Sequence, residues 1–322
     1  MYLDVEHRVR LAYDGFIRES FIELRLHPKT TPHQTVSAFV LAVGPPTSVH
    51  RYRDFQDNVV HHLSINKFHD RIEVQSRSLV HTHPAHPPVA SLVEPVPLPH
   101  IAYELHDFLE LDGPLRASAA LQRFHRTLDV PKDAPLGRQV QAIGAAIHEK
   151  FKYQRDVTRY DSTTDDFLQA GAGVCQDFTH LMLALLRQRR IPCRYVSGYL
   201  HVERASGEPS QSHAWIELHS PTQGWVPFDP THDREIDERY VVVAHGRHYD
   251  DVPPNKGIYR GNAKETLQAE VRTAVSGRKA ISALHEEIRQ IDLPVYQEIP
   301  ERPVERMVTA AEEAAAQQQQ QQ

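Results

Sequence analysis

The sequence has little cysteine, no long apolar run and no excess of positive charge. Cys175 and Cys193 are the two cysteines among 322 residues, too few for a disulfide framework, so we expect a reduced, cytoplasmic setting. No apolar stretch approaches the roughly 20 residues of a membrane-spanning helix, and the N-terminus lacks the pattern of a secretory signal. The net charge of −6 argues against nucleic-acid binding. We therefore expect neither a membrane nor a nucleic acid among its partners.

The N-terminal part of the chain alternates between apolar and polar residues. Leucine and valine alternate with charged residues over 3–11, and residues 22–26 and 35–43 repeat the pattern. Alternation with a period of two is typical of half-buried strands in an antiparallel sheet. Proline then becomes dense from His81 to His100, which predicts a linker or an extended crossing.

Helical patterns follow the proline-rich segment. Residues Tyr103–Leu111 and Leu136–Tyr153 are predicted to be helical, and residues 171–229 alternate between helix and strand patterns. From Lys264 to Ile291 the apolar residues recur at helical spacing, which predicts a C-terminal helix suited to docking or oligomerisation. The glutamine run at the end of the chain predicts disorder.

The segment around Cys175 predicts a helix that begins at this cysteine. Apolar residues recur from Phe178 to Leu186 with the spacing of one buried helical face. Pro192 ends the helix, and glycines at 171 and 173 form a loop before it. Cys175 would lie at the helix N-terminus, where the macrodipole stabilises a thiolate and N–H groups can hold an oxyanion.

Two segments on either side of Ser220–Gly224 predict a β-hairpin. If the hairpin is centred on Pro221, His213 stands opposite Asp229 with Cβ atoms ~5 Å apart, within reach of an imidazole–carboxylate hydrogen bond. This register also places Ala214 opposite Phe228 and Ile216 opposite Val226, which gives one apolar face, while the other face carries Trp215 and Trp225. Both tryptophans are therefore candidates for substrate binding.

Each of these residues also has a purely structural interpretation. Most free cysteines are buried small hydrophobes, and Cys193, in a predicted strand, keeps that interpretation. His213 is one of 22 histidines, and Asp229 before Pro230 could form a turn. The order of a helix-start cysteine, a strand histidine and a facing aspartate favours an activated nucleophile with an oriented base.

Five segments of the sequence resemble bacterial transglutaminase-like proteins with an N-terminal β region. The resemblance also covers His7-Arg-Val-Arg10 and Glu23-Leu-Arg-Leu-His-Pro28, and it runs from about residue 2 to Gly261. Where relatives carry a glycine before Asn58, this chain has Asp57, which puts the local turn in doubt. The five segments are Gly173-Val-Cys-Gln-Asp-Phe-Thr-His180, Ile191-Pro-Cys-Arg-Tyr-Val-Ser-Gly-Tyr199, Ser212-His-Ala-Trp215, Gly224-Trp-Val-Pro-Phe-Asp-Pro-Thr231 and Gly246-Arg-His-Tyr-Asp-Asp-Val-Pro-Pro254.

The resemblance implies an α+β fold with a papain-like core, in which a helix bearing the cysteine packs on an antiparallel sheet bearing histidine and aspartate. It implies Cys175 as nucleophile, His213 as base and Asp229 as its orienter. Tyr153 and Gln176 are weak candidates for an oxyanion-hole side chain.

Pattern and resemblance together predict a chain of five parts. Residues 1–82 form an N-terminal antiparallel β domain, 83–100 a proline-rich linker and 101–262 the transglutaminase-like catalytic domain. A helical C-terminal extension (263–309) and a disordered glutamine-rich tail (310–322) complete it.

The predicted chemistry is acyl transfer through a thioester on Cys175, with a peptide or protein amide as substrate. Hydrolysis, as in a cysteine protease or amidase, ranks first, and transfer to an amine, as in protein-glutamine γ-glutamyltransferases, is the alternative. A non-catalytic interaction scaffold is a further hypothesis, against which an intact triad argues.

We expect no cofactor and no metal. The sequence contains no calcium-binding loop. His81, His83 and His86 could chelate a metal, but neither an acidic nor a cysteine ligand lies near them in the chain.

Overall fold

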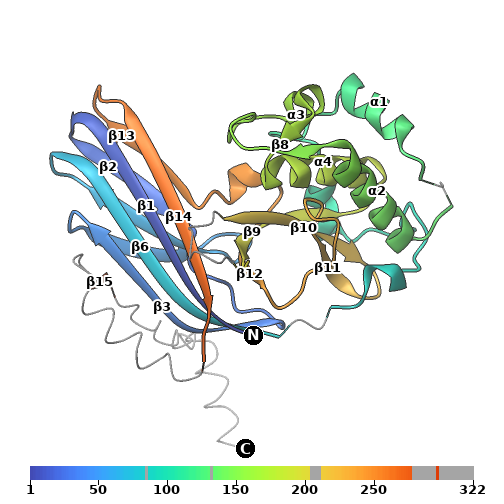
Figure 1. Ribbon diagram of the computed structural model, residues 1–322, viewed down its shortest axis with the longest axis horizontal. Helices are drawn as coiled ribbons and strands as arrows, with labels where there is room; N and C mark the ends of the chain where they lie inside the picture. The colour runs from blue at the N-terminus through green and yellow to red at the C-terminus, as the bar shows by residue number, and fades with distance from the viewer. Residues whose placement is uncertain (84–85, 131–132, 204–211, 278–294, 297–322) are drawn as a thin grey trace, which may run out of the picture.

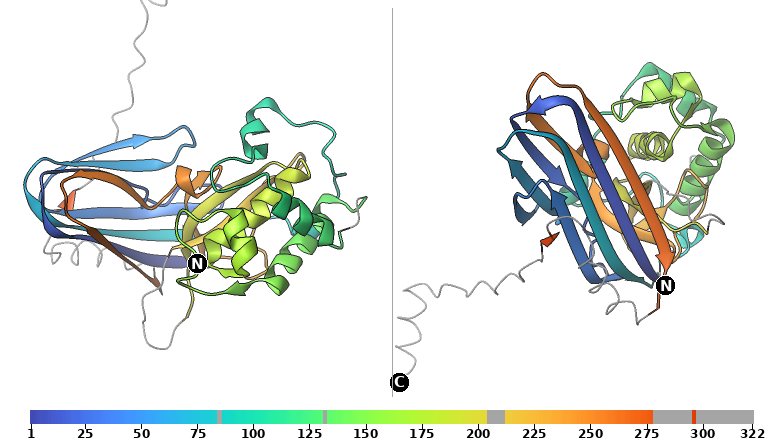
Figure 2. Two further views of the ribbon diagram at one scale, coloured as in Figure 1. Left: turned by 90° about the horizontal axis from the view of Figure 1, so that it is seen from above. Right: turned by 60° about the vertical axis from the view of Figure 1, so that its left-hand side comes forward.

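The computed structural model describes residues 1–83, 86–130, 133–203, 212–277 and 295–296. These residues form two domains that lie side by side, a β domain and a core domain that combines helices with a sheet (Figures 1 and 2). None of the helices within the described residues is long and apolar enough to span a bilayer.

The β domain consists of two antiparallel sheets packed face to face. One sheet has the strand order β14-β1-β6-β3-β15, and the other has the order β13-β2-β5-β4. Alternate residues of both sheets, such as Leu11, Leu24 and Ile72, are buried in a shared apolar core, as the period-two pattern predicts. The strands are β1 (Tyr2–Ile17), β2 (Glu19–Leu24), β3 (Gln34–Gly44), β4 (Ser48–Arg53), β5 (Val59–Ile65), β6 (His69–Thr82), β13 (Asn255–Arg260), β14 (Glu265–Val275) and β15 (Val295–Tyr296).

The chain returns to the β domain after the core domain, and the prediction of a helix from Lys264 is wrong for residues 265–275. These residues form β14, which pairs with β1 from Leu3↔Val275 to Tyr13↔Glu265. β13 pairs with β2, so the return begins at Asn255, before the predicted domain boundary at 262. The rest of the predicted helix, residues 278–291, and the tail predicted from 310 lie outside the described residues.

The core domain is built around one helix and one sheet. The antiparallel sheet has the order β11-β10-β9-β12, and α4 packs on β9 and β10, with α2 against α4. The helices are α1 (Ala119–Thr127), α2 (Leu136–Lys150), α3 (Thr164–Ala170) and α4 (Cys175–Gln188), with 3-10 helices η1 (Val89–Ser91), η2 (Tyr103–Leu109) and η3 (Tyr249–Asp251). The strands are β7 (Lys152–Tyr153), β8 (Ala172–Gly173), β9 (Cys193–Leu200), β10 (His213–Ser220), β11 (Gly224–Phe228) and β12 (Tyr240–Gly246).

The described part of the proline-rich segment packs into the core domain. Val89 and Leu92 are buried in the same apolar cluster as α2 and α4. The backbone N–H of Gly137, in the first turn of α2, donates to the carbonyl of Leu92 at 2.9 Å. The segment therefore supports α2 rather than crossing the surface as a free linker.

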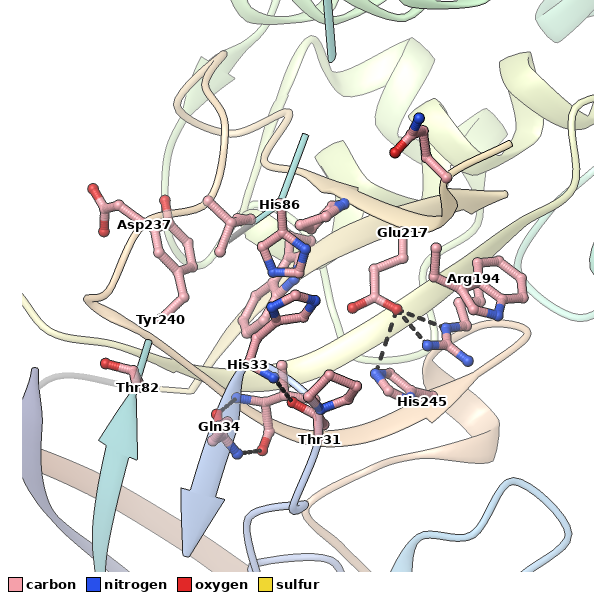
Figure 3. A pocket seen from close by; sticks show the side chains of 17 residues that line it. Thr31, His33, Gln34, Thr82, His86, Arg194, Glu217, Asp237, Tyr240 and His245 are labelled. Atoms are coloured by element: carbon pink, nitrogen blue, oxygen red, sulfur yellow. Dashed lines mark hydrogen bonds and ion pairs between the residues drawn. The ribbon is translucent and has the colours of Figure 1, made fainter. Parts of the chain in front are cut away.

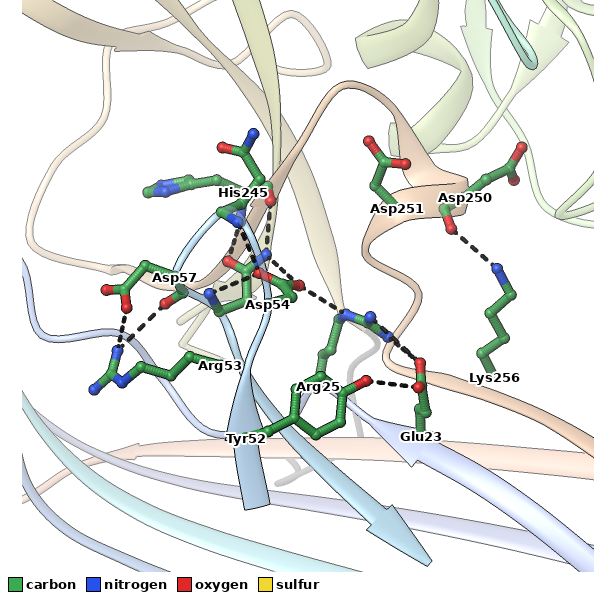
Figure 4. A network of polar contacts seen from close by, with 12 residues as sticks. Glu23, Arg25, Tyr52, Arg53, Asp54, Asp57, His245, Asp250, Asp251 and Lys256 are labelled. Atoms are coloured by element: carbon green, nitrogen blue, oxygen red, sulfur yellow. Dashed lines mark hydrogen bonds and ion pairs between the residues drawn. The ribbon is translucent and has the colours of Figure 1, made fainter. Parts of the chain in front are cut away.

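Two side-chain amides of the β domain, those of Gln34 and Asn58, complete the edge strand β12 of the core sheet. Asn58 Oδ1 accepts the N–H of His245 and Asn58 Nδ2 donates to its carbonyl, both at 2.8 Å. Gln34 pairs in the same way with the N–H and carbonyl of Val242, again at 2.8 Å. Each amide takes the place of a neighbouring strand. We call these two residues the edge clasp; Figure 4 shows its surroundings at His245.

The turn before Asn58 forms without the glycine that relatives carry. Asp57 takes the left-handed conformation with φ 58°, which costs an L-residue roughly 1–2 kcal/mol. Asp54 Oδ1 accepts the N–H groups of Gln56 and Asn58, both at 3.0 Å, and Lys29 Nζ donates to the carbonyl of Asp57 at 3.0 Å. These contacts hold the turn in place despite the strain.

Candidate active site

Cys175 is the first residue of α4, as the sequence predicts. The helix buries its apolar face completely, from Phe178 to Leu186, against the sheet. Cys175 itself is half-buried, whereas Cys193 on β9 is buried, and burial raises the pKa of the Cys193 thiol to about 11. The two thiols are therefore in different environments, and Cys175 is the accessible one.

A buried carboxylate holds the loop before Cys175 against the helix. Asp177 is 3% exposed, and its Oδ2 accepts the N–H of Val174 at 2.7 Å and the hydroxyl of Thr158 at 2.6 Å. This oxygen lies where a side chain on Gly173 would stand, since a Cβ there would come within 2.4 Å of it. The glycine is required at this position, and Asp177 fixes the approach to the helix N-terminus.

His213 is the first residue of β10 and hydrogen-bonds to Asp229. Its Nε2 lies 2.8 Å from Asp229 Oδ2, which confirms the predicted contact. The predicted register is wrong, however, because β10 pairs with β11 as Ile216↔Phe228 and Ser220↔Gly224. The pairing is shifted by two residues from the prediction, so the same residues keep the apolar face. Asp229 lies just after β11 in a turn closed by its bridge to Arg234.

The hairpin loop explains the shift in register. Gly224 has φ +72°, and the Ser220 hydroxyl accepts the N–H groups of Thr222 and Gln223 at 3.3 and 3.1 Å. The loop thus has three residues and is centred on Thr222 rather than on Pro221, a geometry that favours a glycine at the left-handed position.

Asp229 is the centre of a hydrogen-bonded group. Its Oδ2 accepts from His213, from His232 Nδ1 and from the Tyr240 hydroxyl, each at 2.8 Å. Its Oδ1 accepts the N–H groups of Thr231 and His232 at 2.9 and 3.3 Å. The carboxylate is fully buried, and five donors compensate for its loss of hydration.

These contacts determine the charge states of His213 and Asp229. Burial alone lowers the pKa of His213, but hydrogen bonds with Asp229 and Cys175, together with their negative charges, outweigh it and raise the pKa to about 10. Burial alone raises the pKa of Asp229, but the hydrogen bonds from His213 and His232 hold it well below its usual range. The geometry thus favours an imidazolium next to Cys175 and an ionised carboxylate behind it.

His232 and Tyr240 are partners of Asp229 that were not predicted from the sequence. His232 follows Asp229 by three residues in a tight turn, a spacing that predicts contact with the aspartate side chain. Tyr240 comes from β12, and no local pattern in the sequence connects it with Asp229. Arg234 Nε donates to the Tyr240 hydroxyl at 2.8 Å, so the tyrosine is fixed in place.

Trp215 and Trp225 line a cavity of about 290 Å³ between the core sheet and the β domain. Trp215 is fully buried and packs edge-on against Tyr240 with ring centroids 5.3 Å apart. Figure 3 shows the polar residues of the cavity, where Arg194 donates to Glu217 at 2.7 Å. Trp215 therefore packs against Tyr240, the residue whose hydroxyl donates to Asp229. A binding role for the two tryptophans stays a prediction.

The two weak candidates for an oxyanion hole lie close to the helix N-terminus. Tyr153, on β7, is 51% exposed. The side-chain amide of Gln176 donates to the carbonyl of Tyr160 at 2.8 Å, so that this amide holds the neighbouring loop.

The structure divides the three histidines between two contacts. His81 stacks on Tyr2 with ring centroids 4.2 Å apart and lies 5.2 Å from the ring of His83, whereas His86 packs against His33 at 3.9 Å. Among the described residues, the three side chains that could jointly hold a metal ion are His213, Asp229 and His232.

Both domains match known protein families. Residues 122–230 match the transglutaminase-like superfamily, and residues 3–81 match the bacterial transglutaminase-like N-terminal region. The chain is 34% identical over 288 residues to an uncharacterised protein of Mycobacterium leprae, an alignment that covers 83% of this chain and 96% of that protein. It is 29% identical over 283 residues to an uncharacterised protein of Mycobacterium tuberculosis, covering 82% of this chain and 89% of that protein.

Two further relatives carry more informative names. A protein-glutamine gamma-glutamyltransferase of Pseudomonas aeruginosa is 34% identical over 141 residues, which are 38% of this chain and 21% of that protein. The crystal structure of a candidate cysteine protease from Cytophaga hutchinsonii superposes with a TM-score of 0.72 at 21% identity, covering 86% of this chain and 92% of that one. The shared fold is therefore an N-terminal β domain with a papain-like core, and the chain belongs to the transglutaminase-like superfamily.

Proposed function

We propose that the protein is a thiol hydrolase that cleaves amide bonds of peptides or proteins, with Cys175 as nucleophile, His213 as base and Asp229 as its orienter. The observation that carries the proposal is the buried hydrogen bond of 2.8 Å between His213 and Asp229, formed next to the accessible thiol at the N-terminus of α4. A histidine held in this way is oriented and kept protonated beside the nucleophile.

The geometry supports a two-step reaction. The Cys175 thiolate attacks the amide carbonyl, while N–H groups at the start of α4 stabilise the oxyanion. His213 then protonates the leaving amine, and a thioester forms on Cys175. In the second step, His213 takes a proton from water, and the hydroxide equivalent releases the carboxylic acid and restores the thiolate. Asp229 keeps the imidazole in place through both steps.

Transfer to an amine is the alternative outcome of the same thioester. The partial similarity to a protein-glutamine gamma-glutamyltransferase favours it as the second candidate. The chemistry of the three residues is the same for both reactions, because only the group that attacks the thioester differs.

One experiment separates the two reactions. The protein is incubated with dimethylcasein and a fluorescent primary amine, and amine incorporation is followed on gels while new amino termini are quantified. We expect new termini to form faster than amine is incorporated, and neither product to form with Cys175→Ser. Incorporation that outpaces cleavage would replace hydrolysis with amine transfer. Products that persist with Cys175→Ser would refute a thioester on Cys175.

A further inference from the structure

The carboxylate of Asp229 serves a second imidazole that the proposed reaction does not use. His232 Nδ1 lies 2.8 Å from the same Oδ2 that accepts from His213. The His232 side chain is 42% exposed, whereas those of His213 and Asp229 are 9% and 0% exposed. The group therefore has one member at the surface and two beneath it.

These three side chains form a complete set of metal ligands. His213 Nε2, Asp229 Oδ2 and His232 Nδ1 all lie within 4.8 Å of one another. Two imidazoles and one carboxylate suit Zn²⁺, which takes three protein ligands and one water in open sites. We propose that His213, Asp229 and His232 form an inhibitory site for a transition-metal ion of the zinc class.

The ion fits once shifts of the two imidazole rings make the distances between the three ligand atoms equal. Around a tetrahedral Zn²⁺ with bonds of ~2.0–2.1 Å, ligand atoms lie roughly 3.3 Å apart. Each nitrogen is now 2.8 Å from Asp229 Oδ2 and must move away from it by about half an ångström as the ion replaces the two N–H protons. The two nitrogens, which lie within 4.8 Å of each other, must take up the same separation. The exposed ring of His232 gives the ion a route from solvent, and water can fill the fourth position.

The residues around the three ligands suit a metal site. Tyr240 donates to Asp229 Oδ2 at 2.8 Å and accepts from Arg234 Nε, also at 2.8 Å. Such contacts orient a ligating carboxylate and hold it ready for the ion. Because Nε2 of His213 contacts Asp229, the opposite nitrogen is the one left to interact with the Cys175 side chain, and it can do so while Nε2 binds the metal.

Occupation of the site would stop the proposed reaction. With the lone pair of Nε2 on the metal and a proton on Nδ1, His213 has no lone pair left to accept a proton from water or from the thiol. Asp229 would no longer orient the ring, since its Oδ2 would be bound to the ion. This inhibition rests on the proposed function, whereas the binding of the metal does not.

Cobalt binding tests the site without reference to activity. The purified apoprotein is titrated with Co²⁺, and the visible absorption of four-coordinate Co²⁺ is recorded for wild type, His232→Gln, Cys175→Ser and His100→Gln. His100 is an exposed histidine outside the site and serves as the matched control. We expect one absorbing Co²⁺ per chain in wild type, Cys175→Ser and His100→Gln, and none in His232→Gln.

Retention of the band in His232→Gln would overturn the proposal, as would a thiolate-to-cobalt band that disappears in Cys175→Ser. His232→Ala serves as a second variant. Alkylation of Cys175 at the wild-type rate shows that the His232 and His100 variants are folded, and an unchanged circular dichroism spectrum shows the same for Cys175→Ser. In the activity assay, His232→Gln should raise the Zn²⁺ concentration for half-inhibition at least about tenfold, because a lost ligand costs no less than a lost outer-shell contact. If no activity is found, the cobalt result still decides whether the metal site exists.

Discussion

Replacement of Asn58 with alanine is expected to destabilise the whole protein, because Asn58 joins the two domains at the edge of the core sheet. Asn58 is 1% exposed, and its amide satisfies both backbone groups of His245, which is 5% exposed. Alanine would leave the N–H and the carbonyl of His245 buried without these partners. Each such loss costs about 1–3 kcal/mol, so the expected loss is about 2–6 kcal/mol.

Urea unfolding followed by tryptophan fluorescence measures this loss, since both tryptophans lie in the core domain close to the β domain. Asn66→Ala is the matched control, because Asn66 is an exposed asparagine of the same domain, and it should change stability by less than about 0.5 kcal/mol. A loss below about 0.5 kcal/mol for Asn58→Ala would refute the view that the edge clasp holds the domains together.

Three further predictions follow from single contacts. Asp57→Gly should raise the free energy of unfolding by about 0.5–1 kcal/mol, because glycine adopts the left-handed backbone without strain. A free energy of unfolding that falls by as much in urea titration would contradict this. Thr158→Val should cost about 1–3 kcal/mol at pH 7, since the buried carboxylate of Asp177 loses a donor, and a thermal melt unchanged from wild type would count against it. Because the imidazolium of His213 persists up to a pKa of about 10, activity should fall as the pH rises through about 10. Asp229→Asn should move this limb of the kcat/KM profile to lower pH and reduce kcat/KM by about 10²–10⁴; an unmoved limb would be inconsistent with a His213–Asp229 pair.

Local patterns predicted β1, β2 and β3 of the β domain and the helix of Cys175, because burial on one face imposes a period on the sequence. The same rule explains the error at residues 265–275. Leu267 and Val271 are four residues apart, a spacing that fits both one turn of a helix and two repeats of the two-residue strand period. The residues between them follow the strand period, since apolar Ala269 lies between the polar residues Gln268 and Glu270. Pairing with β1 decides the matter, because that strand offers a full-length partner.

The contact between His213 and Asp229 could be predicted although its register could not. A shift of two residues keeps every side chain on its face, so the apolar pattern is equally satisfied by both registers. The choice depends on the loop, where Gly224 and the hydroxyl of Ser220 favour a three-residue turn. Asp229 still reaches His213 because it lies beyond the end of β11, where the chain bends back towards Arg234.

Contacts between distant segments lay beyond prediction from one sequence. The hydroxyl of Tyr240 reaches Asp229 from β12, and Asn58 reaches His245 across 187 positions of the chain. Neither contact leaves a local period or a turn signature. The first contact depends on how the strands of the core sheet are arranged, and the second depends on how the β domain packs against that sheet.

Alkylation of Cys175 across pH tests the central claim, that His213 activates this thiol, most directly. The protein is treated with iodoacetamide from pH 5 to 10, and adducts on Cys175 and Cys193 are quantified by mass spectrometry in wild type and in His213→Ala. The buried Cys193 serves as an internal control in the same chain. We expect rapid labelling of Cys175 at pH 6, at least about tenfold slower labelling at that pH in His213→Ala, and similar rates for the two proteins near pH 10. A Cys175 that labels with the same pH profile with or without His213 would contradict the proposal.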